Sequence, residues 1–146
     1  MPMKTFRGLL PDGGKDRIYL AGGDTTSGYR IAKFELMMYD PAGDEAEITI
    51  QVWKTSAAAD AATKYIDFTQ DALLAAGYIE NNAAPYYPED FTVIFDREVI
   101  NQDIFITNNV GDAGSLGINY YIELEQVKMS DNETAVVNFN AALLVT

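Results

Sequence analysis

Apolar and polar side chains alternate in three segments of this chain, residues 32–38, 47–52 and 120–125. A period of two is that of a β-strand with one face packed and the other in water. In the first segment, for example, the charged residues Lys33 and Glu35 separate apolar neighbours. We therefore expect these apolar positions to face a core: Phe34, Leu36, Met38, Ile48, Ile50, Val52, Tyr120, Ile122 and Leu124.

Short runs rich in β-branched and aromatic residues predict further strands. They are Arg17–Ala21, Leu73–Ile79, Phe91–Phe95, Asp103–Thr107 and Ala135–Phe139. Turn-forming residues separate the strands, as in Asp12-Gly13-Gly14. Many short strands at this spacing are typical of an antiparallel β-sandwich or a jelly roll. We expect one all-β domain over residues 1–146.

The middle of the chain is less regular. Ser56–Thr63 is rich in alanine, which suits either a short helix or a mobile loop. Asp71–Tyr78 is apolar enough for a strand or for two helical turns, and we favour a strand over Leu73–Ile79. Asn81–Pro88 contains two prolines and Tyr86-Tyr87, and this composition predicts an exposed loop.

The residue types that the chain lacks argue against most enzyme mechanisms. Its 146 residues include no cysteine and no histidine, so thiol nucleophiles, disulfides and imidazole bases are absent. The net charge of −12 opposes binding to nucleic acid or to anionic membranes. No apolar run approaches the ~20 residues of a membrane span, and the first residues lack the apolar core of a signal peptide. We expect synthesis in the cytoplasm without secretion.

Carboxylates are the only abundant reactive groups. Glu123 and Glu125 lie two apart on one strand face and fit a glycosidase pair, but alternation alone explains them as a solvent face. Asp12–Asp16 and Ser130–Glu133 have the residue types of calcium loops, although neither has EF-hand spacing and turn formation accounts for both. We therefore assign no catalytic, cofactor-binding or metal-binding residue.

Five segments between residue 5 and about residue 132 resemble sequences of a known group of proteins. They are Thr5–Gly13, Gly28–Ile31, Val93–Asp96, Asn101–Ile104 and Asn119–Gln126. These segments are similar to parts of small virion proteins of marine bacteriophages such as cyanophages. The resemblance implies a head-associated structural protein of the decoration or cement type, attached to the outside of the capsid. It implies no catalytic residue and no cofactor.

Charge is distributed unevenly along the chain. Residues 1–33 hold six basic and three acidic residues, a net +3, whereas residues 34–146 hold four basic and nineteen acidic residues, a net −15. The N-terminal segment is therefore best suited to approach an acidic surface, and we interpret residues 1–10 as an arm that docks onto a partner. Pairing of Lys4 and Arg7 with this domain's own carboxylates is the alternative. The predicted partner-binding residues are Lys4, Phe6, Arg7, Leu9, Leu10, Tyr86 and Tyr87.

These observations favour a structural protein on the surface of a phage capsid. Its partners would be the major capsid protein or other virion proteins, and we expect a dimer or trimer because shell attachment usually repeats one contact around an axis. The alternative is a tail or fibre domain that binds carbohydrate, with or without calcium, for which Tyr86, Tyr87 and Tyr121 offer a stacking platform. A small carboxylate hydrolase is the third hypothesis.

Overall fold

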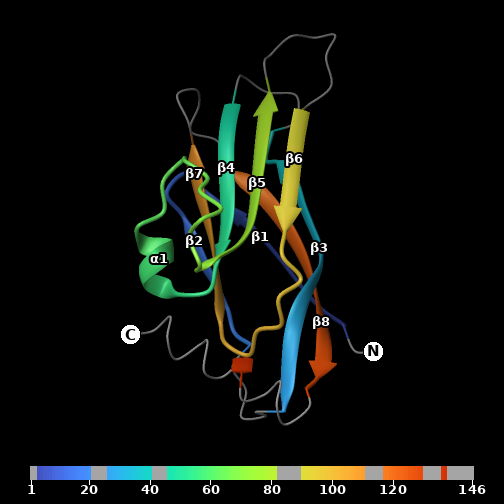
Figure 1. Cartoon of the computed structure of the whole chain (residues 1–146). Coiled ribbons are helices and arrows are strands. Elements are labelled where there is room, and N and C mark those ends of the chain that lie inside the picture. Colours follow the sequence, from blue (N-terminus) through green and yellow to red (C-terminus); the bar gives the residue numbers. More distant parts are fainter. Residues whose placement is uncertain are drawn as a thin grey trace.

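Two antiparallel sheets packed face to face form a β-sandwich (Figure 1). This computed structural model describes residues 3–20, 26–40, 46–81, 90–110, 117–129 and 136–137. The all-β fold predicted from alternation is confirmed.

The smaller sheet has three strands in the order β1-β8-β3. They are β1 (Met3–Leu10), β8 (Ile118–Lys128) and β3 (Ser27–Met38). The central strand β8 pairs along its length with β3 on one side and with β1 on the other. Both β1 and β3 are therefore edge strands.

The larger sheet has five strands in the order β2-β7-β4-β5-β6. They are β2 (Lys15–Ile18), β7 (Ile104–Val110), β4 (Ala46–Trp53), β5 (Leu73–Asn81) and β6 (Asp90–Phe95). A tight turn carries the chain from β1 in one sheet to β2 in the other. In this turn Gly13 has a φ of 75°, a conformation that favours glycine, and the Gly14 amide donates to the Pro11 carbonyl.

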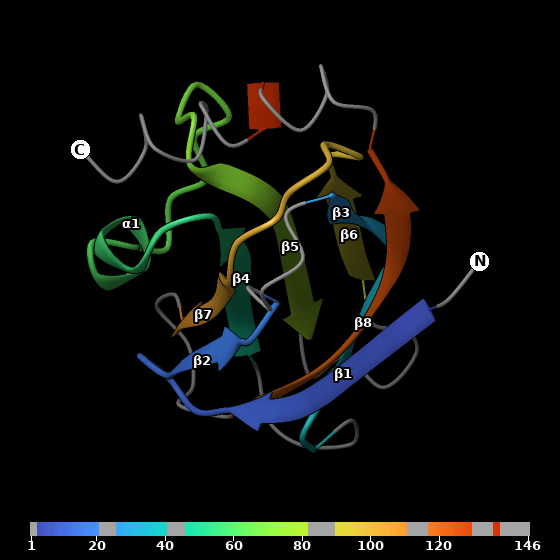
Figure 2. The ribbon, with the colours of Figure 1, turned by 90° about the horizontal axis from the view of Figure 1, so that it is seen from below.

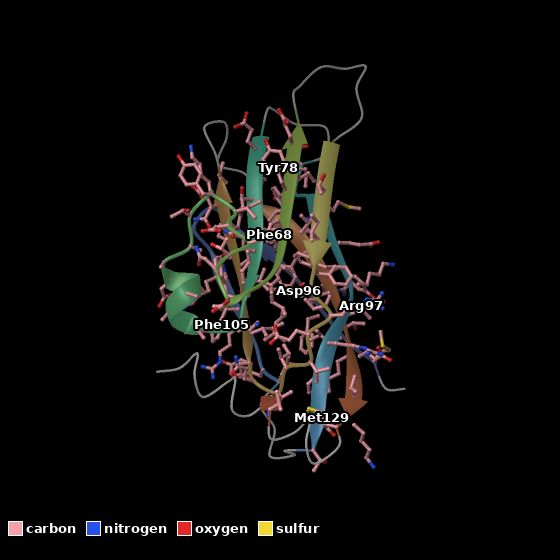
Figure 3. The ribbon with its side chains drawn as sticks, in the orientation of Figure 1. Phe68, Tyr78, Asp96, Arg97, Phe105 and Met129 are labelled. Carbon is pink, nitrogen blue, oxygen red and sulfur yellow. The ribbon has the colours of Figure 1, made fainter. Side chains whose placement is uncertain are left out.

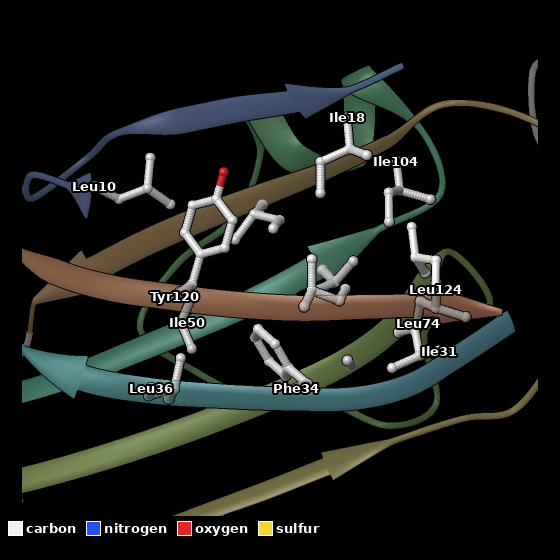
Figure 4. Close-up of a cluster of buried hydrophobic side chains, with 14 of the residues drawn as sticks. Leu10, Ile18, Ile31, Phe34, Leu36, Ile50, Leu74, Ile104, Tyr120 and Leu124 are labelled. Atoms are coloured by element: carbon white, nitrogen blue, oxygen red, sulfur yellow. The ribbon is translucent and has the colours of Figure 1, made fainter. Parts of the chain in front are cut away.

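The core lies between the sheets, and every apolar position predicted to face it is buried. Ile48, Ile122 and Leu124 are fully buried, and side chains of both sheets form one continuous cluster (Figure 4). The register of β3 shifts between Ile31 and Lys33, so that Ile31 joins the core and Ala32 is only partly buried. A bulge of this kind changes which residue faces inward, and alternation alone does not reveal it.

The outer face of the larger sheet is partly covered by helix α1 (Ser56–Asp60) and by the segment that follows it (Figure 2). The side chain of Thr55 caps the helix by accepting a hydrogen bond from the Ala58 amide. Beneath the helix a second, small apolar cluster contains Trp53, Ala59, Leu73 and Phe105. The alanine-rich segment thus begins as a short helix.

Side chains of the sheet also bind the backbone after α1. Thr49 Oγ1 donates to the carbonyl of Lys64, Gln51 Nε2 to that of Thr63, and Asn109 Nδ2 to that of Ala62. Three successive carbonyls are thereby satisfied by polar residues of β4 and β7. This arrangement explains why polar side chains occupy buried positions on the outer face of this sheet.

Two predicted strands differ from the structure. The strand expected over Arg17–Ala21 ends at Ile18, because the amide of Leu20 donates to Asp103 Oδ1 at 2.7 Å and leaves the strand ladder. In the strand expected over Ala135–Phe139, the two described residues, Val136 and Val137, are helical. Periodicity does not distinguish a strand from a helical turn in so short an apolar run.

The N-terminal segment that we interpreted as a docking arm is not separate from the domain. Residues 3–10 form β1, which pairs with β8 from Met3 opposite Glu125 to Leu10 opposite Ile118. The segment completes the smaller sheet because its alternate residues Phe6 and Leu10 pack against the core. The loop predicted over Asn81–Pro88 begins at the end of β5 and otherwise lies outside the described residues.

Candidate docking surface

The partner-binding residues predicted on the N-terminal segment divide between two sides of β1. Phe6 is partly buried against the core and Leu10 is 2% exposed, so neither offers a free surface. Lys4 is on the same side and lies with its Nζ 5.1 Å from the centre of the Tyr29 ring. Arg7 and Leu9 face outward because successive side chains of a strand point to opposite faces. Tyr86 and Tyr87 lie outside the described residues.

Arg7 and Leu9 belong to two rows of side chains that cross the outer face of the smaller sheet. In one row Arg7 of β1 lies opposite Tyr121 of β8, which lies opposite Glu35 of β3. In the next row Leu9, Asn119 and Met37 are aligned in the same order. These six residues surround an open hollow of about 550 Å³, which we call the sheet hollow.

The sheet hollow combines exposed apolar groups with an unpaired cation. Leu9 is 47% exposed and Met37 is 64% exposed. Arg7 makes no ion pair or hydrogen bond through its guanidinium with any residue that the structure describes. It lies near the Tyr121 hydroxyl, whose pKa is raised chiefly by its hydrogen bond to Glu123, whereas Arg7 opposes this increase.

The outer face of the smaller sheet is electrically balanced, although the chain as a whole carries −12. Its acidic residues are Glu35, Glu123 and Glu125, and its basic residues are Arg7, Arg30 and Lys33. Arg30 Nε lies 2.7 Å from Glu125 Oε2, and Lys33 Nζ lies 3.4 Å from Glu35 Oε1. The excess negative charge of the protein is therefore carried elsewhere, and this face can approach another acidic protein without strong repulsion.

The two carboxylates considered for glycoside cleavage have structural partners. Glu123 Oε1 accepts a hydrogen bond from the Tyr121 hydroxyl at 2.7 Å. The hydrogen bond from Arg30 lowers the pKa of Glu125, which keeps that group ionised. A glycosidase requires one carboxyl group with a raised pKa to act as the acid, and Glu125 has the opposite shift.

The carboxylates of the first proposed calcium loop also hold strands together. Asp12 Oδ1 accepts from the amide of Val110, and Asp16 Oδ2 accepts from the hydroxyl of Tyr120 at 2.8 Å. In the described part of the chain, no group of three or more acidic side chains is placed to hold a metal ion. The second loop, Ser130–Glu133, lies outside the described residues.

Sequence reasoning found Arg7 and Leu9 but missed Glu35, Met37 and Asn119. A signal for Met37 was present, because an apolar residue between two inward positions of a strand must face outward. The sequence could not show that Met37 lies in the same row as Leu9, since β1 and β3 are far apart in sequence and are joined only through β8.

Within the described residues, no helix has the length and apolar character needed to cross a membrane. No protein-family model matches the sequence, and no curated protein matches it either.

Proposed function

We propose that this chain is a structural protein without enzymatic activity, a decoration protein that attaches to the outer surface of a bacteriophage head. The sheet hollow is the observation that carries the proposal: Arg7, which has no ion-pair partner among the described residues, lies beside the row that holds the exposed apolar side chains Leu9 and Met37. The resemblance to marine phage virion proteins supports the same function. A β-sandwich with a rigid, pre-formed face suits attachment to a shell, since binding then costs little ordering of the chain.

The residues of the sheet hollow have the composition of an interface centre. Arginine, tyrosine and methionine are enriched in protein interfaces, and arginine and tyrosine often contribute most of the binding energy. Arg7 lies opposite Tyr121, and Met37 lies in the next row on the same face, so the three residues present one contact surface. We infer that the partner inserts an apolar side chain between Leu9 and Met37 and offers a carboxylate to Arg7.

The location of the protein on particles is the direct test. Antibodies raised against the folded domain should label the outside of intact heads in immuno-electron microscopy of purified virions. Labelling confined to tails or fibres, or absence of the protein from the particles, would contradict the proposal.

The docking surface is tested by charge reversal. Arg7→Glu should weaken binding to particles that lack the protein by about tenfold or more, because it removes a cation from the contact surface and adds a repulsive charge. Lys64→Glu is the matched control, since Lys64 is exposed over the larger sheet, on the side where Figure 3 labels Phe68 and Tyr78, and the change in net charge is the same. Both variants should keep the wild-type circular dichroism spectrum. Equal binding by the two variants would show that the sheet hollow is not the attachment site.

Met37→Asp probes the apolar part of the same surface. It should weaken binding in both low and high salt, because burial of an apolar group depends little on screening. The contribution of Arg7 should instead decline as salt is raised.

A further inference from the structure

An exposed apolar patch lies on the outer face of the larger sheet, on the opposite side of the sandwich from the sheet hollow. It consists of Phe68 in the segment after α1, Tyr78 of β5 and Ile94 of β6, and we call it the aromatic patch. Tyr78 lies opposite Thr92, which is two residues from Ile94 and therefore on the same face of β6. Phe68 lines a small pocket together with Ile94. Figure 3 shows Phe68 and Tyr78 on this face.

The side chains of the aromatic patch are exposed to solvent. Val93 and Phe95 pack against the core, so Ile94 between them points outward and is 53% exposed. Phe68 is 63% exposed, and Tyr78 is 36% exposed. Single exposed apolar residues are ordinary on a protein surface, whereas a contiguous group of them marks an interaction site.

The pocket shared by Phe68 and Ile94 indicates the size of the group that binds there. Its volume is about 60 Å³, whereas pockets for drug-sized ligands have volumes of about 300–1,000 Å³. It therefore has room for the end of one side chain and not for a separate small molecule. Its lining is apolar except for one carboxylate: Phe68, Leu73, Leu74, Ile94, Phe95 and Asp96.

This lining fits a lysine or arginine side chain. Both have an apolar stem that packs on apolar surface and a charged end that stays at the solvent. The stem would lie between Phe68 and Ile94, and the charged end would meet the exposed carboxylate of Asp96. The face of the Phe68 ring would attract the same cation.

Carboxylates without cationic partners border the aromatic patch. Asp67 and Asp71 flank Phe68 in the sequence, and both are exposed, as is Asp96. None of these three carboxylates forms an ion pair with the described part of the chain. The hydrogen bonds that Asp67 accepts from the hydroxyl and the amide of Thr69 lower the pKa of Asp67, so this group stays ionised.

Two basic residues near this border interact with other groups. Arg97 follows Asp96 in the chain but lies toward the smaller sheet, because the pKa of Glu125 is lowered chiefly by Arg30 and further by Arg97. Lys64 lies with its Nζ 5.5 Å from the centre of the Tyr65 ring. The border of the patch is therefore complementary to a positively charged partner.

We propose that the aromatic patch binds a segment of another protein that places a lysine or arginine side chain in this pocket, with its stem against Phe68 and its charged end at Asp96. A second copy of this chain fits less well, because two molecules of charge −12 repel each other. The inference does not rest on attachment to a capsid, since the aromatic patch and the sheet hollow are on different sheets.

Two-dimensional NMR of the full-length ¹⁵N-labelled protein with end-blocked heptapeptides provides the test. The probes are Ser-Gly-Leu-Lys-Leu-Gly-Ser and three analogues in which arginine, norleucine or glutamate replaces the lysine. We expect the lysine or the arginine peptide to shift the amide signals of Phe68, Leu74, Ile94 and Asp96 in a saturable manner. The norleucine peptide, which keeps the stem but has no charge, should bind about three- to fivefold more weakly, and the glutamate peptide more weakly still.

Two variants separate the charged and apolar parts of the contact. Asp96→Asn should weaken binding of the basic peptide about three- to fivefold and leave binding of the norleucine peptide unchanged. Phe68→Ala should weaken binding of both peptides, because it removes an apolar wall of the pocket. Asp40→Asn is the matched control for charge, since Asp40 is exposed and follows β3 of the smaller sheet.

The proposal is overturned if no peptide shifts these amides, or if the norleucine peptide binds as tightly as the basic ones. It is also overturned if the Asp96→Asn and Phe68→Ala variants, confirmed as folded by their spectra, bind the basic peptide as tightly as the wild type. Shifts of the same amides on raising the concentration of the protein alone would show that a second copy occupies the patch, which contradicts the proposal.

Discussion

Tyr120 and Tyr121 are adjacent residues of β8 with different surroundings. Tyr120 faces the core, is 5% exposed and donates from its hydroxyl to Asp16 Oδ2, which joins the two sheets. Tyr121 faces outward and donates to Glu123 on its own strand. One side chain thus joins the two sheets, whereas the other belongs to the proposed docking surface.

The Tyr120→Phe substitution should lower the free energy of unfolding by about 1–3 kcal/mol, because the lost hydrogen bond has a charged acceptor. Tyr121→Phe is the control and should cost about 0.5 kcal/mol or less, because its hydroxyl is on the surface. Urea unfolding of both variants measures the difference. Equal costs would show that the Tyr120–Asp16 contact contributes nothing to stability.

Tyr120 should also make the protein sensitive to alkali. Burial, and then the hydrogen bond to Asp16, raises the pKa of Tyr120 well above its ordinary value of 10.0. Stability from a group with a raised pKa in the folded state is fully present below pH 10 and is lost as the pH rises toward that higher pKa. Denaturation curves should therefore show falling stability above pH 10, and the Tyr120→Phe variant should show a smaller decrease. An identical pH dependence in the variant would contradict this assignment.

The large apolar residues of β8 should have the cost typical of a packed core. Leu124 is 0% exposed, and Leu124→Ala should destabilise the protein by about 2–5 kcal/mol through lost burial and a residual cavity. Ile94, which is 53% exposed, provides the control, and Ile94→Ala should change stability by less than about 0.5 kcal/mol. A small effect at Leu124, measured by thermal or urea unfolding, would show that its surroundings collapse into the space.

At the scale of elements, β1 combines two functions through alternation. Its inward residues complete the core, whereas Arg7 and Leu9 of its outward side belong to the sheet hollow. An edge strand is exposed to a partner by its position, and strand pairing makes it rigid. The segment is therefore a strand of the sandwich and not a flexible tether, and its outward side is part of the proposed docking surface.

Substitutions in β1 should separate these two functions. Phe6→Ala should cost about 1–3 kcal/mol, less than for a fully buried phenylalanine, because Phe6 is only partly buried. Thr5→Ala, at an exposed outward position beside it, should have little effect on stability. Deletion of residues 1–10 should abolish cooperative unfolding, because it uncovers one edge of β8. A deleted form that unfolds cooperatively with wild-type stability would show that β1 is dispensable.

At the scale of the whole molecule, the net charge of −12 opposes the compact state by self-repulsion. Raising NaCl from about 20 mM to about 500 mM should raise the Tm, because the Debye length falls from more than 10 Å to less than 8 Å. Differential scanning calorimetry measures the shift in Tm. A repeat at higher pH tests whether specific anion binding causes the shift. A Tm that is independent of salt would show that the charges are too far apart to interact.

Self-association is the second prediction at this scale. Attachment to a symmetric shell favours repeated contacts, so we expect dimers or trimers in solution. Light scattering coupled to size-exclusion chromatography, over a range of concentrations and at high salt, measures the mass. A monomer under all these conditions would indicate that any oligomer forms only on the particle.

Local sequence determined most of the fold. Alternation is enforced by the pleat of each strand, so the inward positions of β3, β4 and β8 could be derived before any partner strand was known. The same reasoning identified β5 and the turn at Asp12–Gly14, because these features depend on neighbours in sequence.

Tertiary structure alone decided which outward residues meet. Arg7, Met37 and Tyr121 come from three strands that are distant in the chain, and their register depends on the pairing of β8 with both edge strands. A polar pocket lined by Gly13, Asp60 and Thr107 likewise brings together the turn before β2, α1 and β7. Local patterns specify the direction of a side chain, but contacts across strands depend on non-local pairing that no single segment encodes.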